Sequence, residues 1–266
     1  MNRIEDRLSL LKEKNEKAFI TYITAGLPDY DKTKDIIRAE ERAGVDVIEL
    51  GVPFSDPIAD GPVIQDASYR ALLNGANIDK TFNAVKEIRE EGVKIPIVFM
   101  LYMNTVNHFG VAAFLDKCIE AGVDGLIIPD LPMEEQDEIK ELLKDEKRND
   151  LILIQLVSPV SKQRIPQILS GARGFVYCVS AMGVTGQSGT YHKNIIEYLK
   201  DVKDKSSIPV MMGFGITEAK DVLPMKDIID GCIVGSHFIK LMDGSGFDPE
   251  AAFEYCSKFK KELNDQ

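Results

Sequence analysis

Basic residues are scarce in this chain relative to acidic ones. Lysine and arginine number 32 against 43 aspartates and glutamates, so the formal net charge at pH 7 is −11. A strongly acidic surface repels phosphate backbones, which makes nucleic acid an unexpected partner. The same charge argues against binding to an anionic membrane surface.

Cysteine is rare, and long apolar runs are absent. The cysteines form no C-x-x-C pair and stand far apart, at Cys118, Cys178, Cys232 and Cys256. Sparse thiols of this kind favour buried cysteines in a reducing compartment over a disulfide framework. No apolar stretch approaches the roughly 18 residues of a membrane helix, and residues 1–17 lack the apolar segment of a signal peptide. These absences predict a soluble, cytoplasmic protein.

Short apolar segments recur along the whole chain. Hydrophobic residues make up 44% of the sequence, which is enough for a sizeable core. Most of the segments are apolar throughout rather than alternating, as in parallel strands that are buried on both faces. The eight predicted strands are Ala18–Ala25, Val45–Leu50, Ile95–Leu101, Val123–Ile128, Leu151–Val157, Gly174–Val179, Pro209–Met212 and Ile228–Val234.

Helical patterns separate these strands. The phrase Ala-Gly-Val-Asp joins a helix to a strand twice, at 43–46 and 121–124, which indicates equivalent turns. Eight strand–helix units in about 250 residues predict a (β/α)8 TIM barrel. The predicted helices are Lys32–Ala43, Val63–Asn74, Asp79–Glu91, Val111–Ala121, Glu134–Asp145, Ser161–Ser170, Lys193–Lys203 and Thr217–Leu223.

The N-terminal segment predicts one further helix. Ile4, Leu8 and Leu11 follow at i, i+4 and i+7, so one face of this segment is apolar. We expect it to cover the bottom of the barrel. No low-complexity linker interrupts the chain, and residues 1–266 are therefore expected to form a single domain.

Two connections are longer than a simple strand–helix turn. Loop 2 runs from Gly51 to about Pro62, and loop 6 from Ser180 to about Tyr191. Both follow strands, at the C-terminal face where barrel enzymes hold their active sites. Long loops in a compact domain are usually functional.

Two acidic residues near loop 2 are candidates for catalysis. Glu49 stands between two large apolar residues at the end of the second strand, where burial raises a carboxyl pKa towards neutrality and permits general acid–base chemistry. A structural carboxylate is an equally good interpretation of Glu49 from its position alone. Asp60 precedes Gly61-Pro62, and an isolated aspartate there is typical of a helix N-cap or a turn.

The motif LGVPFSDPIADGPVIQ around loop 2 resembles the signature of the tryptophan synthase alpha subunit family. Further segments fit in order along the chain: FITYITAGLPD, MLYMN, IIPDLP, YCVSAMGVTG, GFGI and VGSHFIK. The resemblance implies a lyase that cleaves indole-3-glycerol phosphate to indole and glyceraldehyde 3-phosphate by a retro-aldol step. The family's catalytic acid falls on Glu49 and its second carboxylate on Asp60. Glu49 would shuttle the proton between the indole C3 and the glycerol hydroxyl, and ionised Asp60 would stabilise the indole N–H and then take its proton.

The resemblance also implies the residues that hold the substrate. The phosphate would bind to backbone N–H groups in glycine turns, at Gly186, Gly215, Gly235 and Ser236. Tyr177 would lie beside the substrate hydroxyls, although the sequence alone favours a core aromatic. The indole pocket would be formed by Tyr22, Met100, Ile127, Pro129 and Phe214, each of which is equally compatible with barrel core. In loop 6, Thr185 would contact Asp60, and Ala181 stands where the family often has arginine.

The resemblance implies a partner as well. The family works with a tryptophan synthase beta subunit in an α₂β₂ complex, and the indole passes to that subunit. No cofactor is expected in this chain, and pyridoxal phosphate would belong to the beta subunit. The best-placed interface residues are Pro53, Phe54, Asp56 and Asn104, together with the 129–132 turn; the alternative interpretation is a stiff exposed loop without a partner.

Other chemistries fit less well. Three lone histidines, His108, His192 and His237, have no metal-ligand spacing. No lysine ends a predicted strand, which disfavours a Schiff-base aldolase. An indole-glycerol-phosphate synthase or a sugar-phosphate isomerase would lack the loop 2 motif. A non-catalytic regulator would not need both Glu49 and Asp60.

Overall fold

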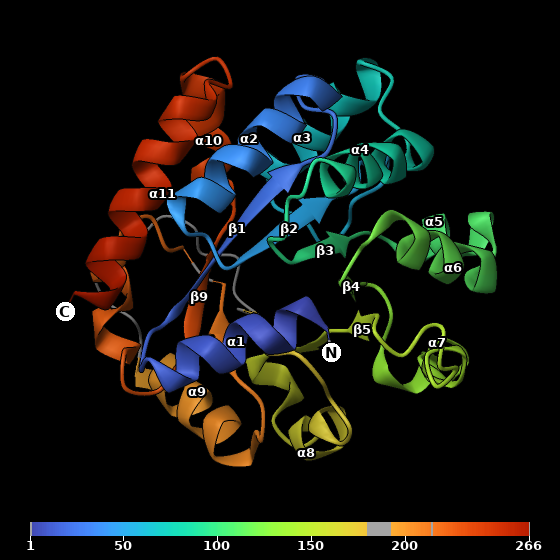
Figure 1. The fold of residues 1–266 in the computed structure, drawn as a ribbon. Coiled ribbons are helices and arrows are strands. Elements are labelled where there is room, and N and C mark those ends of the chain that lie inside the picture. The colour runs from blue at the N-terminus through green and yellow to red at the C-terminus, as the bar shows by residue number, and fades with distance from the viewer. Residues whose placement is uncertain (1, 180–192, 214, 266) are drawn as a thin grey trace.

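Parallel strands form a single sheet in the computed structural model, which describes residues 2–179, 193–213 and 215–265. Hydrogen-bonded neighbours follow the order β5-β4-β3-β2-β1-β9-β8-β7-β6, and helices surround the strands (Figure 1). The strands are β1 (Ala18–Thr24), β2 (Val47–Gly51), β3 (Ile97–Met100), β4 (Gly125–Ile127), β5 (Ile152–Leu153), β6 (Gln155–Val157), β7 (Val176–Cys178), β8 (Val210–Met212) and β9 (Gly231–Val234).

The sheet closes through the fifth predicted strand. β5 and β6 are separated only by Ile154, and the first pairs with β4 while the second pairs with β7. The two ends of the strand order therefore belong to one continuous segment, Leu151–Val157 in the prediction. Each of the eight predicted strands overlaps a strand of the structure, although β2 extends one residue further, to Gly51, and the (β/α)8 barrel is confirmed.

Most of the predicted helices are present in the structure. The α-helices are α1 (Arg3–Glu13), α2 (Tyr30–Ala43), α3 (Pro62–Leu73), α4 (Ile78–Glu90), α5 (Met103–Phe109), α6 (Val111–Ala121), α7 (Asp137–Leu142), α8 (Ile165–Leu169), α9 (Lys193–Lys205), α10 (Ser236–Gly244) and α11 (Pro249–Asn264). The 3₁₀-helices are η1 (Met133–Glu135), η2 (Pro159–Ser161) and η3 (Ala219–Met225). The sequence analysis did not predict α5. It does predict a helix that opens at Gly235-Ser236 and a last helix around Lys258–Lys261, where α10 and α11 lie.

Three helix predictions were wrong in extent or type. A helix over Ser161–Ser170 would place Pro166 in its interior; instead α8 begins at Ile165 and holds Pro166 in its first turn, where proline is tolerated. The segment predicted as Thr217–Leu223 forms the 3₁₀-helix η3, whose Pro224 has no N–H for an α-helical ladder. The segment predicted as Glu134–Asp145 forms only η1 and the short α7.

The helix α1 covers one end of the barrel, as predicted. Figure 1 shows it lying in front of the strands. Its apolar residues Ile4, Leu8 and Leu11 are buried in one cluster with interior side chains of the barrel, among them Ile20 and Val98. This end of the barrel is therefore a packed core, which leaves the other end, where the strands terminate, for function.

The repeated Ala-Gly-Val-Asp phrase forms two equivalent buried turns. Asp46 accepts a hydrogen bond from the Phe19 backbone N–H at 2.7 Å, and Asp124 accepts one from the Ile97 N–H at 2.8 Å. Arg7 and Arg3, one turn apart on α1, approach Asp46 and Asp124 respectively, each at 2.7 Å.

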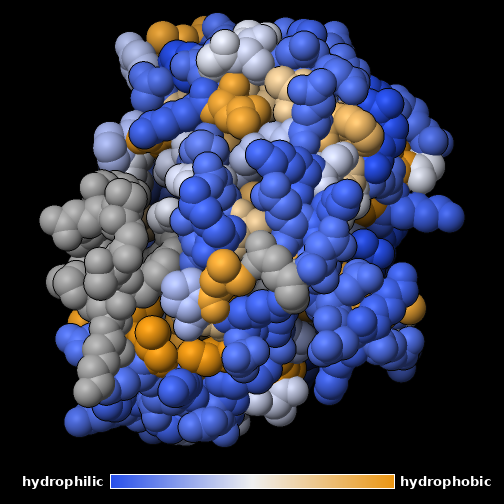
Figure 2. Space-filling model, turned by 90° about the vertical axis from the view of Figure 1, so that its left-hand side faces the viewer, coloured by the Kyte–Doolittle hydropathy of each residue, from blue (hydrophilic) through white to orange (hydrophobic). Residues whose placement is uncertain are grey.

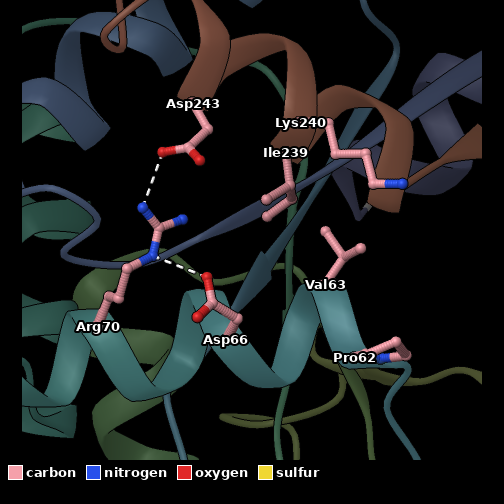
Figure 3. A pocket seen from close by; sticks show the side chains of 7 residues that line it. All are labelled: Pro62, Val63, Asp66, Arg70, Ile239, Lys240 and Asp243. Atoms are coloured by element: carbon pink, nitrogen blue, oxygen red, sulfur yellow. Dashed lines mark hydrogen bonds and ion pairs between the residues drawn. The ribbon is translucent and has the colours of Figure 1, made fainter.

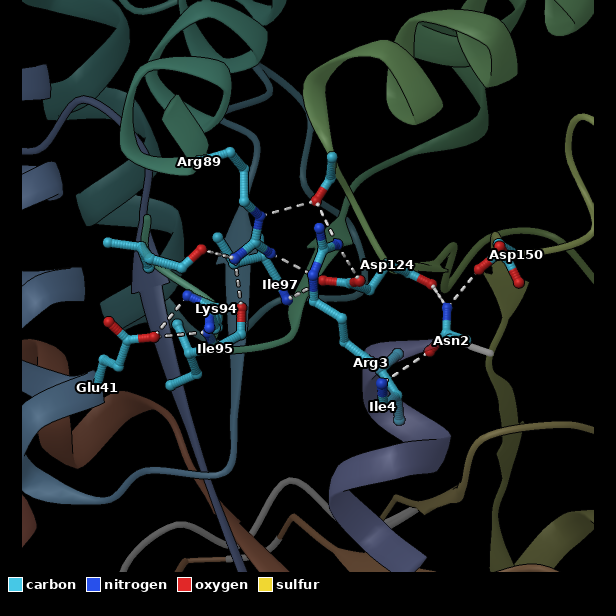
Figure 4. A network of polar contacts seen from close by, with 12 residues as sticks. Asn2, Arg3, Ile4, Glu41, Arg89, Lys94, Ile95, Ile97, Asp124 and Asp150 are labelled. Carbon is cyan, nitrogen blue, oxygen red and sulfur yellow. Dashed lines mark hydrogen bonds and ion pairs between the residues drawn. The ribbon is translucent and has the colours of Figure 1, made fainter. Parts of the chain in front are cut away.

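The turn at Asp124 extends into a wider polar network at the base of the barrel. Arg89 pairs with Asp124 at 2.9 Å, and the Asn2 side chain donates to the Asp124 backbone carbonyl at 2.7 Å (Figure 4). These contacts attach the N-terminus to the strand entrances and close this end of the barrel.

The outer surface carries mostly hydrophilic side chains on the side that Figure 2 shows, the left-hand side of Figure 1 with α10 and α11. Among the described residues, no helix combines the length and apolar character that a membrane crossing requires. All four cysteines are buried and unpaired.

Candidate active site

Glu49 lies inside the barrel at the carboxyl end of β2. Side chains alternate along a strand, so Glu49 shares the interior face with Val47, which belongs to the interior cluster. Its strand neighbours in register are Tyr22 and Val98. The Glu49 side chain is 1% exposed, and its Oε1 has no hydrogen-bond partner among the described residues. This burial raises the pKa of Glu49 to about 8.

Asp60 in loop 2 is held by a tyrosine from the end of β3. The Tyr102 hydroxyl donates a hydrogen bond to Asp60 Oδ2 at 3.0 Å, and the backbone N–H of Ala59 donates to that hydroxyl at 3.0 Å. Partial burial raises the pKa of Asp60 to about 6, while the hydrogen bond from Tyr102 acts in the opposite direction. Asp60 is therefore a weaker acid than Asp normally is, and a stronger one than Glu49.

The alternative interpretation of Asp60 as a helix N-cap is wrong. The N-cap of α3 is Gly61, which has no capping side chain, and Pro62 occupies the first turn. The Asp60 carboxylate is directed to Tyr102 instead. The sequence analysis missed Tyr102. The available signal was its position just after the third strand, at the same sheet edge as loop 2.

Two tyrosines occupy space that glycines leave open beside Glu49. A Cβ atom at Gly51 would lie 2.0 Å from the Tyr22 hydroxyl, and one at Gly213 would lie 2.6 Å from the Tyr177 hydroxyl. Burial, with the nearby Asp60 and Glu49 carboxylates, raises the pKa of both tyrosines well above the usual value. Both phenols therefore stay neutral and can donate hydrogen bonds in the mouth of the barrel.

The remaining residues predicted for the indole pocket differ in accessibility. Met100 and Pro129 are half-buried, and Met100 packs against the interior cluster. Ile127 is fully buried within that cluster, so it reaches a ligand only if its neighbours move. Phe214, Thr185, Gly186 and Ala181 lie outside the described residues.

Two of the predicted phosphate residues, Gly235 and Ser236, lie at the start of α10. Gly235 is the N-cap of this helix, and no side chain caps it, while Ser236 is its first residue. Uncapped backbone N–H groups at a helix start favour an anion. A Cβ at Gly235 would lie 3.7 Å from Tyr22 Cβ, and the position of Gly215 Cβ is open. The start of α10 therefore lies next to Tyr22, the strand neighbour of Glu49.

The four predicted interface residues are not equally exposed. Asp56 and Asn104 are exposed, Phe54 is half-buried and Pro53 is buried. Phe54 stacks on Tyr102 with 5.2 Å between ring centroids. Beside them, Ile58 at the tip of loop 2 is 82% exposed, which makes the outer side of this loop the accessible part.

The described residues form no cluster typical of a metal site. No group of three or more of their His, Cys, Asp and Glu side chains is placed to hold a metal ion. None of the described strands ends in a lysine. The site thus offers two carboxyl groups, neutral phenols and helix N–H groups.

Comparison with known proteins gives a consistent result. The family model described as tryptophan synthase alpha chain matches residues 8–266. The tryptophan synthase alpha chain of Lachnospira eligens is 63% identical and covers 99% of this chain and 100% of its own length. That of Alkaliphilus metalliredigens is 44% identical, with 99% and 97% coverage.

Solved structures show the same similarity. Tryptophan synthase subunit alpha from Legionella pneumophila superposes with a TM-score of 0.90 at 33% identity, covering 100% of both chains. A ligand-free tryptophan synthase structure from M. tuberculosis gives a TM-score of 0.86 at 30% identity, covering 99% of both chains.

Proposed function

The chain belongs to the tryptophan synthase alpha chain family, and we propose that Glu49 and Asp60 are the two carboxyl groups that carry out the family's reaction. That reaction cleaves indole-3-glycerol phosphate to indole and glyceraldehyde 3-phosphate. The chain is thus a carbon–carbon lyase of tryptophan biosynthesis.

The observation that carries the assignment is the difference between the two carboxyl environments. With a pKa of about 8, buried Glu49 is mostly protonated at neutral pH, whereas Asp60, with a pKa of about 6, is mostly ionised. Two carboxyl groups whose environments separate their pKa values can serve as acid and as anion at one pH.

The proton movements follow from this pair. Glu49 gives its proton to C3 of the indole ring, which places positive charge on the ring nitrogen. The ionised Asp60 stabilises this charge through the N–H, and any proton that it accepts from the nitrogen returns to the ring when the carbon–carbon bond breaks. The bond between C3 and the side-chain carbon then breaks, and its electron pair stays with the ring. The hydroxyl on that carbon returns a proton to Glu49 as the aldehyde forms.

The substrate-binding roles are part of the same proposal. The phosphate binds to backbone N–H groups at Gly215, Gly235 and Ser236, with Gly186 contributing from loop 6. Tyr177 lies beside the substrate hydroxyls. The apolar pocket for indole comprises Tyr22, Met100, Ile127, Pro129 and Phe214, and Thr185 contacts Asp60.

We further propose a tryptophan synthase beta subunit as the partner, in a complex of two alpha and two beta subunits. That subunit would hold pyridoxal phosphate and receive the indole. The exposed Asp56 and Asn104 support docking at this end of the barrel, with Pro53 and Phe54 behind them. The unpaired cysteines are compatible with a cytoplasmic location.

Indole release from indole-3-glycerol phosphate tests the catalytic assignment. Glu49→Gln keeps the shape of the side chain and removes its titration. A general acid–base usually contributes about 10²–10⁴ in rate, so kcat is expected to fall by at least that factor while the melting temperature is kept. Near-normal cleavage by this variant would overturn the role of Glu49.

A further inference from the structure

Two neighbouring helices begin at the two halves of the proposed site. The helix α3 starts at Pro62, two positions after Asp60. The helix α10 starts at Ser236, immediately after Gly235. Any restraint on the spacing of α3 and α10 therefore acts on the carboxylate and on the phosphate site together.

An arginine near the other end of α3 joins the two helices. Arg70 Nη1 lies 2.7 Å from Asp243 Oδ1 on α10, and Arg70 Nε lies 2.9 Å from Asp66 Oδ2 on α3 itself. Figure 3 shows the guanidinium between the two carboxylates. The arginine thus makes one contact between helices and one within a helix.

The two helices leave a cavity between them, from the start of α3 to Arg70. Its volume is about 280 Å³, and it extends from the Arg70 cluster to Pro62, with Val63, Ile239 and Lys240 along its walls. In Figure 3 the side chains of Val63 and Ile239 point towards each other across this space. The Arg70–Asp243 ion pair joins the two helices beside this space, in addition to their shared apolar packing.

We propose that Arg70 is a positioning residue that couples the phosphate site to Asp60 through its ion pair with Asp243. Phosphate bound at the start of α10 restrains that helix. The ion pair transmits the restraint to α3, and the start of α3 restrains Asp60. This inference rests on the proposed phosphate site and on the proposed role of Asp60.

The chain contains no tryptophan, so a single Ile58→Trp substitution at the 82%-exposed tip of loop 2 gives a specific fluorescent reporter. Glycerol 3-phosphate is titrated into this variant without indole. We expect a saturable change in tryptophan emission. A second substitution, Asp243→Asn, should reduce the amplitude of this emission change by at least about half. It removes the charge that pairs with Arg70, and with it the proposed link from α10 to α3.

The matched control is Asp66→Asn, which removes the other carboxylate partner of Arg70 but no contact between helices. It should leave the amplitude unchanged. In the cleavage assay without the reporter, Asp243→Asn and Arg70→Gln should lower kcat about two- to five-fold, the range expected for one exposed ion pair. KM should change less than kcat, and Arg70→Lys should restore most of the rate.

Equal amplitudes for Asp243→Asn and Asp66→Asn would overturn the coupling, as would a reporter that does not respond to glycerol 3-phosphate while this ligand still inhibits competitively. If the proposed phosphate site itself is wrong, a different experiment shows it. Gly235→Asp, which places a carboxylate at the proposed anion site, would then leave inhibition by glycerol 3-phosphate unchanged.

Discussion

The hydroxyl of Tyr102 connects the end of β3 to Asp60, 42 positions earlier in the chain. It donates to the Asp60 carboxylate and accepts from the backbone of Ala59, each at 3.0 Å. Phe54 stacks on the same ring. Loop 2 thus folds over Tyr102 with residues from both of its halves, and Asp60 is positioned without any other chain.

Removing the Tyr102 hydroxyl should shift only the acid limb of the pH profile of kcat/KM. The proposed reaction needs Asp60 ionised and Glu49 protonated, so kcat/KM should be bell-shaped with limbs near pH 6 and pH 8. The Tyr102 hydrogen bond lowers the pKa of Asp60. In Tyr102→Phe that pKa rises, the acid limb moves to higher pH, and the alkaline limb stays.

The measurement is kcat/KM from about pH 5 to about pH 9.5. Loss of one hydrogen bond, about 0.5–1.5 kcal/mol, moves the acid limb up by roughly 0.4–1.1 pH units. The value of kcat/KM should then fall roughly two- to twelve-fold well below pH 6, and by about two-fold or less at pH 7. Tyr69→Phe removes the hydroxyl of an exposed tyrosine on α3 and should leave the profile unchanged. An acid limb that stays in place in Tyr102→Phe would show that this hydroxyl does not control Asp60.

Asp60→Asn separates charge from shape. Asparagine retains the size of the side chain and a hydrogen-bond acceptor for Tyr102, and α3 does not depend on it for capping. The fold should therefore survive, with a melting temperature close to that of the parent chain, while cleavage falls by about tenfold or more because the anion is lost. Thermal melts beside turnover test this. If turnover survives as well, the negative charge is not required.

The barrel could be predicted because its strands carry a local signal. Segments such as Val45–Leu50 are buried on both faces, and their apolar runs appear in the sequence without knowledge of their neighbours. The position of Glu49 followed from the end of such a run. Asp60 was harder, since its contact with Tyr102 depends on how loop 2 folds back on another strand, and an aromatic residue after a strand looks like ordinary core.

Glu40 is a second residue whose environment the local sequence pattern does not predict. It lies on α2, whose amphipathic pattern predicts a polar residue facing solvent, yet the structure buries it completely. Neither of its carboxylate oxygens has a hydrogen-bond partner among the described residues. Burial raises its pKa to about 8, partly offset by Thr21.

Glu40→Gln should stabilise the protein at alkaline pH. Because the folded state holds the Glu40 proton more tightly than the unfolded state, its contribution is fully present below about pH 4.5 and is lost as the pH rises to about 8. The gain from the substitution should thus grow with pH, to roughly 1–4 kcal/mol above pH 8.

Chemical unfolding followed by circular dichroism at about pH 6 and about pH 8.5 measures this difference. Glu90→Gln, at an exposed position on α4, is the control and should have little effect at either pH. A stability gain for Glu40→Gln that does not increase with pH would contradict the assignment of a buried neutral carboxyl group.

The last prediction concerns the proposed beta subunit. Loop 2 carries Asp60 on its inner side and exposes Asp56 and Ile58 on its outer side. A partner that covers the outer side restricts the same loop that holds the catalytic carboxylate, and ordering a catalytic loop acts on kcat as well as on binding. The chain alone should therefore cleave its substrate weakly, with some activity retained because Tyr102 already holds Asp60.

Titrating the cognate beta subunit into a steady-state indole assay should raise kcat strongly. Substituting Asp56 or Asn104 by alanine should shift the titration to higher beta-subunit concentrations, whereas Asp6→Ala, on α1 at the opposite end of the barrel, should not. If kcat stays flat and the lone chain is already fully active, Tyr102 and Phe54 suffice to order loop 2 and no partner is needed. If the rise occurs but Asp56 and Asn104 have no effect on it, the partner docks elsewhere on the barrel and acts on loop 2 from a distance.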